Sequence, residues 1–210
     1  AIAAVICLTS GRFDWLWGWA LLAVVVAFDI SRALVLIPRH PDLLNERGKV
    51  LPGSKKWDRW MYMLGISLLP FAALILSGLD ERFGWRPAMP LAGNLAGLAV
   101  SAAGYALALW AMAVNRFFST IVRIQTERGH TVVTGGPYRF VRHPGYVGVI
   151  LTTVAMPVSL GSWWAVIPAL LAVFFLVLRT ALEDRILIAE LPGYGDYIRQ
   201  TRYRLIPGIW

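Results

Sequence analysis

Long apolar runs without a charged side chain limit what this chain can fold into more than any other feature of the sequence. An α-helix rises about 1.5 Å per residue, so about 20 apolar residues cross the hydrocarbon core of a bilayer. Four runs are uncharged and a fifth contains only one acid and one base; they are Trp60–Leu79, Leu91–Val114, Tyr146–Leu160, Trp163–Leu178 and, with Asp29 and Arg32, Trp15–Ile37. These runs predict an all-α, polytopic integral membrane protein with about five transmembrane helices.

The N-terminal part adds two smaller features to this prediction. Ala1–Thr9 is apolar but too short to cross a membrane, and because the chain starts with Ala we interpret it as a partial helix whose beginning has been trimmed. It lacks the basic region that opens a signal peptide. Asp29 and Arg32 are three residues apart, so they share a helix face and can pair with each other or with a neighbouring helix.

Composition excludes the main soluble classes. Charged residues make up 15% of the 210 residues, whereas soluble domains carry about a quarter. The hydrophobic share of 58% excludes a disordered chain. Cys7 is the only cysteine, which excludes a disulfide scaffold.

Basic residues alternate along the connecting segments. Sixteen of the 20 Lys and Arg residues lie in Pro38–Arg59, Asn115–Gly145 and the tail from Arg179, whereas Asp80–Pro90 is charge-balanced and Gly161–Ser162 is uncharged. By the positive-inside rule, the three basic segments face the cytoplasm. The net charge of +8 is then explained by contact with anionic membrane lipids. Nucleic acid is not an expected partner, because no basic patch stands on a separate soluble domain, and no protein partner is predicted.

Arg179 and Glu183 form the first cluster of side chains suited to chemistry. They are four residues apart, so both project from one face of a helix that continues from the last apolar run. An interfacial ion pair is the structural alternative. An ionisable residue at membrane depth is nevertheless a candidate for function by default.

A second cluster precedes the run Tyr146–Leu160. Pro144 keeps His143 out of the helical conformation and favours a helix start, where backbone amides attract anions. Hydrogen bonding at the helix start alone is the structural alternative for His143. Upstream, Gly135–Tyr138 predicts a turn, and Thr131–Thr134 predicts an extended stretch with free backbone groups.

Several common site motifs are absent. The chain has neither a G-x-G-x-x-G nor a phosphate-binding P-loop motif, and it has no G-x-S-x-G around a serine. It has no H-E-x-x-H motif, and His130 and His143 with one distant cysteine do not have the spacing of a metal site. Soluble nucleotide-binding, hydrolase and metalloenzyme classes therefore lose most of their support, and no metal is expected.

The combined pattern resembles the isoprenylcysteine carboxyl methyltransferase family, with phospholipid methyltransferases more distantly similar. It consists of Gln125, His130 to Val133, Gly136, Tyr138, the Arg142-His143-Pro-x-Tyr146 element, and Arg179 with Glu183. The resemblance is dense from about Asn115 to Trp210, a little under half of the chain. The N-terminal runs show only generic hydrophobicity.

The resemblance implies transfer of a methyl group from S-adenosylmethionine to a lipidic or lipid-attached acceptor in the membrane. It implies that Arg179 faces the acceptor, with Arg179 and Glu183 as catalytic residues. It also implies a cofactor pocket lined by Gln125, His130, Thr131, Val132, Val133, Tyr138, His143, Pro144, Gly145, Tyr146 and Glu183. On this basis residues 1–114 hold the N-terminal transmembrane helices (about 15–37, 60–79 and 91–114). Residues 115–210 form the cytosolic catalytic region, with a cofactor loop, the helical hairpin 146–178 and an amphipathic C-terminal segment.

The sequence departs from the family pattern at two places, which leaves the acceptor open. Gly145 stands where the carboxyl methyltransferases usually carry Ser, and Glu183-Asp184 replaces a run of Glu. An isoprenylcysteine-like carboxylate is one candidate acceptor and a phospholipid amine is another. Outside this class, a membrane reductase that uses a nicotinamide cofactor and a non-enzymatic lipid-binding or transport protein are the alternatives, and Asp29 and Arg32 favour the last.

Overall fold

All regular structure in the described part of the chain is helical. The computed structural model describes residues 2–39, 55–85, 87 and 89–210. Its elements are α1 (Ile2–Ser10), α2 (Leu16–Arg39), α4 (Lys56–Tyr62), the π-helical η1 (Met63–Leu68), α5 (Leu69–Phe83), α6 (Leu91–Val114), the 3-10 turns η2 (Thr126–Arg128) and η3 (Gly136–Arg139), α7 (Pro144–Ser159), α8 (Val166–Glu190) and α9 (Tyr194–Gln200).

Among the described residues, four helical segments are long and apolar enough to cross a membrane, which confirms the predicted all-α, polytopic membrane class. They are Leu16–Arg39, Trp57–Phe83, Leu91–Val114 and Val166–Glu190. Helix α7, with 16 residues, is shorter, as the sequence predicts. The last apolar run continues as one helix through Arg179 and Glu183, as the sequence predicts, and α8 ends at Glu190.

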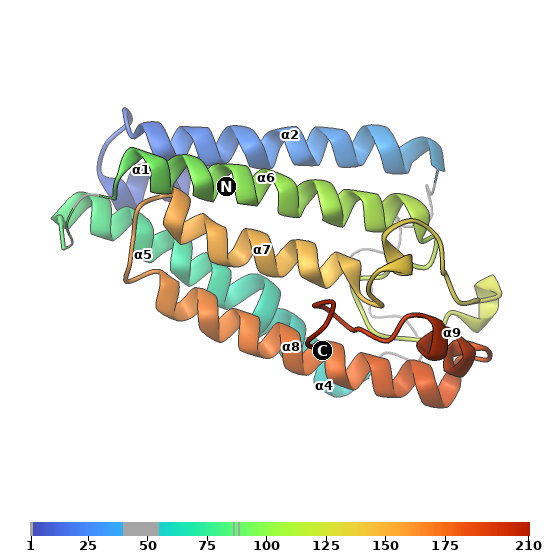
Figure 1. Ribbon diagram of the computed structural model, residues 1–210. Helices are drawn as coiled ribbons and strands as arrows, with labels where there is room; N and C mark the ends of the chain where they lie inside the picture. The colour runs from blue at the N-terminus through green and yellow to red at the C-terminus, as the bar shows by residue number, and fades with distance from the viewer. Residues whose placement is uncertain (1, 40–54, 86, 88) are drawn as a thin grey trace.

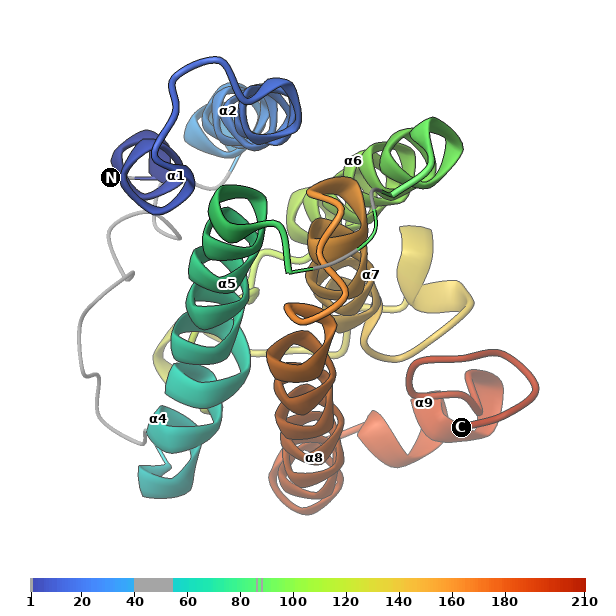
Figure 2. The same ribbon diagram turned by 90° about the vertical axis from the view of Figure 1, so that its left-hand side faces the viewer.

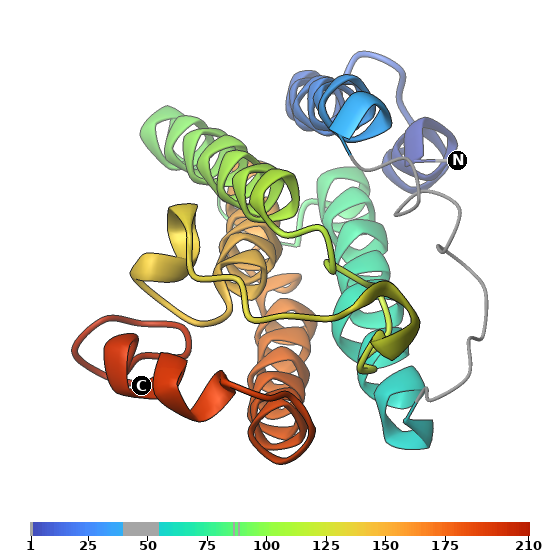
Figure 3. The same cartoon turned by 90° about the vertical axis from the view of Figure 1, so that its right-hand side faces the viewer.

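The helices lie side by side with their connections at two ends (Figure 1). The turns between α1 and α2, α5 and α6, and α7 and α8 lie at one end, here called the turn end, which faces the viewer in Figure 2. Residues 115–143 and the chain after α8 lie at the other end, here called the site end, and cross over the helix ends in Figure 3. The three basic segments, predicted to lie on one side of the membrane, therefore lie together at the site end. In the first of them, Pro38–Arg59, residues 40–54 lie outside the described residues.

Small residues bring α6 and α7 close together. A Cβ on Gly148 would lie 2.5 Å from the Gly104 carbonyl oxygen, and a Cβ on Gly97 would lie 2.4 Å from the Ser159 nitrogen. Lipid supplies no hydrophobic driving force between helices, so close backbone packing of this kind is what holds membrane helices together. Asn94 adds a buried hydrogen bond from Nδ2 to the Ser159 carbonyl oxygen at 2.9 Å. These contacts hold α7, the first helix of the α7–α8 hairpin, against α6 of the N-terminal part of the chain.

Two further sequence expectations can be compared directly with the fold. Asp29 and Arg32 pair with each other at 2.8 Å on α2. The α7–α8 hairpin turns at Gly161, whose φ of 75° favours glycine. Next to it, Ser162 donates a hydrogen bond to Asp80 of α5 at 2.5 Å.

Candidate functional site

A cavity lies at the site end among α7, α8 and the loop between α6 and α7. Its wall is mixed, with apolar side chains such as Ile66, Phe117 and Val149 beside thirteen polar residues. Besides Ser119 and Thr131, the polar lining residues are Asn115, Arg123, His130, Tyr138, Arg142, His143, Tyr146, Arg179, Glu183, Tyr194 and Tyr197.

The cavity brings together most of the side chains that the sequence singled out. His130, Thr131, Val132, Val133, Tyr138, His143, Gly145, Tyr146, Arg179 and Glu183 all line it. Gln125 and Pro144 do not; Gln125 lies behind the wall and Pro144 begins α7. His143 and Arg179, from opposite sides of the hairpin, therefore line the same cavity.

The chain positions His143 as Pro144 predicts. His143 has φ −127° and ψ 59°, outside the helical region, and α7 begins at the next residue. Its backbone N–H donates to the Arg204 carbonyl oxygen at 3.0 Å, and its Nε2 lies 3.2 Å from Asp184 Oδ1. The imidazole is thus fixed by the C-terminal segment and by α8 together.

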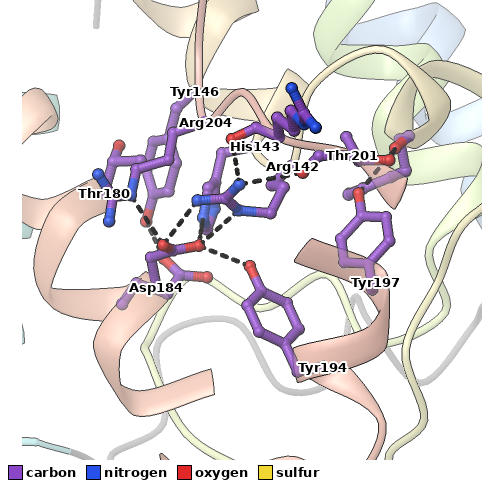
Figure 4. Close-up of polar contacts among 12 residues, drawn as sticks. Arg142, His143, Tyr146, Thr180, Asp184, Tyr194, Tyr197, Thr201 and Arg204 are labelled. Atoms are coloured by element: carbon purple, nitrogen blue, oxygen red, sulfur yellow. Dashed lines mark hydrogen bonds and ion pairs between the residues drawn. The ribbon is translucent and has the colours of Figure 1, made fainter. Parts of the chain in front are cut away.

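Asp184 is the centre of a buried polar network (Figure 4). Arg142 donates to both carboxylate oxygens, Nε to Oδ1 and Nη2 to Oδ2, at 2.9 Å each. Tyr194 adds an O–H donor at 2.8 Å and Arg204 an Nε donor at 2.7 Å. A bidentate arginine with further donors is the arrangement that compensates a buried carboxylate. The network joins the start of α7, α8, α9 and the C-terminal segment into one wall.

Arg179 is buried, at 2% exposure, and its main partner is an aspartate of α4. Nε donates to Asp58 Oδ1 at 2.7 Å, and Nη2 donates to Asp58 Oδ2 at 3.2 Å. Nη2 also donates to the Thr120 carbonyl oxygen at 2.6 Å. The arginine expected to face an acceptor therefore lines the cavity while held by an ion pair.

Glu183 lies one helical turn beyond Arg179 on the same face of α8. It is half-buried and accepts a hydrogen bond from the Tyr146 hydroxyl to Oε2 at 2.6 Å. The Tyr146 ring also lies 5.4 Å from the Arg179 guanidinium carbon. One carboxylate and one aromatic ring thus stand beside each other on the cavity wall.

Gln125 supports the loop that carries His130. Its Nε2 donates to the Phe117 carbonyl oxygen at 2.7 Å, and its Oε1 accepts from Arg128 Nη1 at 2.7 Å. The Gln125 backbone N–H donates to His130 Nδ1 at 3.3 Å, which requires a neutral ring nitrogen there. Burial, together with the charges of Arg123 and Arg128, lowers the pKa of His130 to about 4. His130 is therefore neutral at physiological pH.

The stretch after His130 offers backbone groups to the cavity. Within the described part of the chain, the N–H and C=O groups of Thr131, Val132 and Val133 have no hydrogen-bond partner, and all three residues line the cavity. The predicted turn follows, with Gly136 at φ 57° and the 3-10 turn η3. Tyr138 in η3 accepts from Asn115 Nδ2 at 3.0 Å, and burial raises the pKa of its hydroxyl.

Gly145, one departure from the family pattern, makes room for an aromatic ring. A Cβ at this position would lie 2.5 Å from Phe118 Cε2, closer than real contacts allow. Gly145 and Phe118 both line the cavity. A serine here would therefore require Phe118 to move.

Sequence reasoning missed Asp58, Asp184, Tyr194 and Tyr197 as parts of the site. Nothing in the sequence indicated that α9, which carries Tyr194 and Tyr197, folds back on η3, where the Tyr197 hydroxyl donates to the Tyr138 carbonyl oxygen at 2.7 Å. Asp58 carries no motif and lies 121 residues from its partner Arg179. Only the packing of α4 on α8 could reveal it.

Comparison with known proteins points to one family. Residues 96–189 match the isoprenylcysteine carboxyl methyltransferase (ICMT) family. The chain is 33% identical over 95 residues to the protein-S-isoprenylcysteine O-methyltransferase of Schizosaccharomyces pombe, covering 44% of this chain and 38% of that protein. It is 33% identical over 81 residues to the cobalt-zinc-cadmium resistance protein CzcN of Cupriavidus metallidurans, covering 37% of each. The chain thus spans less than two fifths of the length of these relatives, and the match confirms the resemblance found in the motifs.

Proposed function

We propose that this chain, whose residues 96–189 match the isoprenylcysteine carboxyl methyltransferase family, is an integral-membrane methyltransferase that uses S-adenosylmethionine to methylate a lipidic or lipid-attached carboxylate. One observation carries the proposal: Glu183 and Arg179, one turn apart on α8, line the same cavity as His143 and Tyr146 of α7. The basic segments at the site end support placing this cavity on the cytoplasmic side, where the cofactor is available.

The chemistry of the wall fits S-adenosylmethionine. The cofactor supplies an activated methyl group on a positively charged sulfur. The Glu183 carboxylate suits its ammonium group, and the Tyr146 ring can stabilise a nearby cation. The free backbone groups of Thr131 to Val133 suit its polar parts. Near these groups the wall also carries the apolar side chains of Val132, Val133 and Leu187.

Arg179 is suited to the acceptor rather than to the cofactor. Within the described chain its Nη1 has no hydrogen-bond partner, while Nε and Nη2 are bound to Asp58 and Thr120. Nη1 can therefore donate to an oxygen anion of the acceptor. A guanidinium donor to a carboxylate forms a short, strong hydrogen bond, which aligns the acceptor for in-line transfer.

The contacts favour a carboxylate acceptor over a phospholipid amine. A protonated amine must lose a proton before it can attack, which requires a general base within hydrogen-bond reach. Glu183 is already bound to the Tyr146 hydroxyl, and the Nε2 of His143 is held against Asp184. A carboxylate is already anionic and requires no base. We therefore place O-methylation of a carboxylate ahead of N-methylation.

Incubation of the purified protein with a membrane lipid extract and S-adenosylmethionine tests the proposal. Mass spectrometry should show a lipid or lipid-attached species that gains one CH₂ unit only when protein and cofactor are both present. A mass gain of two hydrogens that depends on NADPH would instead support a reductase. Uptake of a labelled solute into vesicles without either cofactor would support a transporter.

A further inference from the structure

Helix α4 reaches the candidate site although it precedes the family-matched residues 96–189. Three residues at four-residue spacing, two in α4 and one in η1, make the contacts of this segment with the site. The Asp58 carboxylate binds Arg179, the Tyr62 ring lies 5.5 Å from the Arg179 guanidinium carbon, and Ile66 in the following π-helical turn lines the cavity. Residues four apart lie on one helix face, so a single face of this segment meets the site.

Asp58 is fully buried and fully engaged. Its Oδ1 accepts from Arg179 Nε at 2.7 Å, and its Oδ2 accepts from Arg179 Nη2 at 3.2 Å. Oδ2 also accepts from the Val122 backbone N–H at 2.8 Å. Asp58 therefore joins α4, α8 and the loop that forms one wall of the cavity.

The two bonds to Asp58 fix where the third nitrogen of Arg179 lies. The guanidinium is planar and rigid, so binding Nε and Nη2 also sets the direction of Nη1. The Tyr62 and Tyr146 rings contact the same guanidinium, with their centroids 5.5 and 5.4 Å from its Cζ. Without the carboxylate, Arg179 keeps several rotatable bonds and a buried, uncompensated charge.

We propose that Asp58 is a positioning residue for methyl transfer, which holds Arg179 so that its Nη1 is presented to the acceptor. The proposal rests on the proposed function and adds to it that the N-terminal part of the chain completes the acceptor side of the site. Asp58 has no contact with Glu183, the residue assigned to the cofactor, so its removal should affect the acceptor and leave cofactor affinity unchanged.

The test compares Asp58→Asn with the wild-type protein in lipid nanodiscs. Asparagine keeps the size of the side chain but removes its charge. Its NH₂ group opposes Arg179 Nε if it takes the place of Oδ1, or both Arg179 Nη2 and the Val122 N–H if it takes the place of Oδ2. We expect kcat/KM for an S-prenylated cysteine carrying a free carboxylate to fall at least tenfold, and affinity for S-adenosylhomocysteine to stay within twofold. Asp58→Glu, which keeps the carboxylate, should recover part of the loss. In an Arg179→Ala background, Asp58→Asn should cause no further loss of turnover.

Asp80→Asn is the matched control, because Asp80 is a buried aspartate of the same span at the turn end, next to Ser162. It should lower the melting temperature without changing kcat/KM of the folded protein. If Asp58→Asn behaves like Asp80→Asn, Asp58 is only structural and the inference is wrong. Equal weakening of S-adenosylhomocysteine binding would also overturn it. If the wild-type protein methylates no carboxylate, the proposed function is wrong and this inference is wrong with it. If the wild-type protein turns over normally and Asp58→Asn does so too, only the inference is wrong.

Discussion

In the described part of the chain, two arginine–aspartate pairs at the site end have both side chains buried, and they differ in whether the arginine keeps an unpaired donor. In the Arg142–Asp184 pair every guanidinium nitrogen is used, because Nε and Nη2 bind the carboxylate and Nη1 donates to the carbonyl oxygens of Thr201 and Arg202. In the Arg179–Asp58 pair, Nη1 of Arg179 has no partner in the described chain.

The difference separates a scaffold from a ligand-binding group. A buried polar network in which every donor and acceptor is satisfied gives rigidity and has no capacity for a ligand. An arginine with one unpaired donor facing a cavity can bind a ligand and gains from doing so. We therefore expect the first pair to matter chiefly for stability and the second chiefly for turnover.

The largest effect on stability should come from Asp184→Ala. The substitution leaves the buried Arg142 and the part-buried Arg204 without their counter-charge, so the free energy of unfolding should fall by about 3–5 kcal/mol. Denaturant or thermal unfolding in detergent measures it. Asp196→Ala is the control, because its carboxylate is exposed on α9 and pairs with Arg199, which is also exposed; it should cost less than about 1 kcal/mol. Equal losses in the two variants would refute the distinction.

Arg179→Lys should reduce turnover by about 100-fold, because an acceptor carboxylate that is no longer held by Nη1 is misaligned for in-line attack on the methyl group. Lysine keeps the charge but cannot bind Asp58 through two nitrogens while presenting a third to a ligand. The measurement is kcat for a prenylcysteine acceptor together with S-adenosylhomocysteine affinity, which should be retained. Loss of cofactor affinity with turnover preserved would show that the roles of Arg179 and Glu183 are reversed.

Glu183→Ala should weaken cofactor binding by about 1.5–3 kcal/mol, the usual contribution of a hydrogen bond to a charged group. Titration calorimetry with S-adenosylhomocysteine measures the change. Glu190→Ala provides a matched acid on the same helix, since Glu190 is exposed and pairs with Lys55 instead. If both variants bind the cofactor equally well, Glu183 is not a cofactor ligand.

The smallest effect should come from Tyr194→Phe, which removes one donor to Asp184 and keeps the ring. Asp184 retains Arg142, His143 and Arg204, so the loss of unfolding free energy should be about 1 kcal/mol. Chemical denaturation provides the value. A loss as large as that of Asp184→Ala would mean that the tyrosine, rather than the arginines, holds the network together.

The sequence predicts the fold class and part of the site because those features are local. Uncharged runs give the helices, four-residue spacing puts Arg179 and Glu183 on one face, and Pro144 sets the conformation of His143. The resemblance predicted that Gln125 lines the cofactor pocket, whereas in the structure its side chain binds the Phe117 carbonyl oxygen and Arg128. The sequence of a loop gives no sign of the direction in which a polar side chain points. Asp58 could not be identified from the sequence, because its contact with Arg179 depends on which helices pack together.

Titration of the wild-type protein with S-adenosylhomocysteine tests most directly whether the cavity between α7 and α8 is a cofactor site. The account predicts saturable one-to-one binding in lipid nanodiscs that Glu183→Ala weakens and Arg179→Ala leaves intact. Absence of binding in both detergent and lipid, under conditions where the protein is folded, would contradict it.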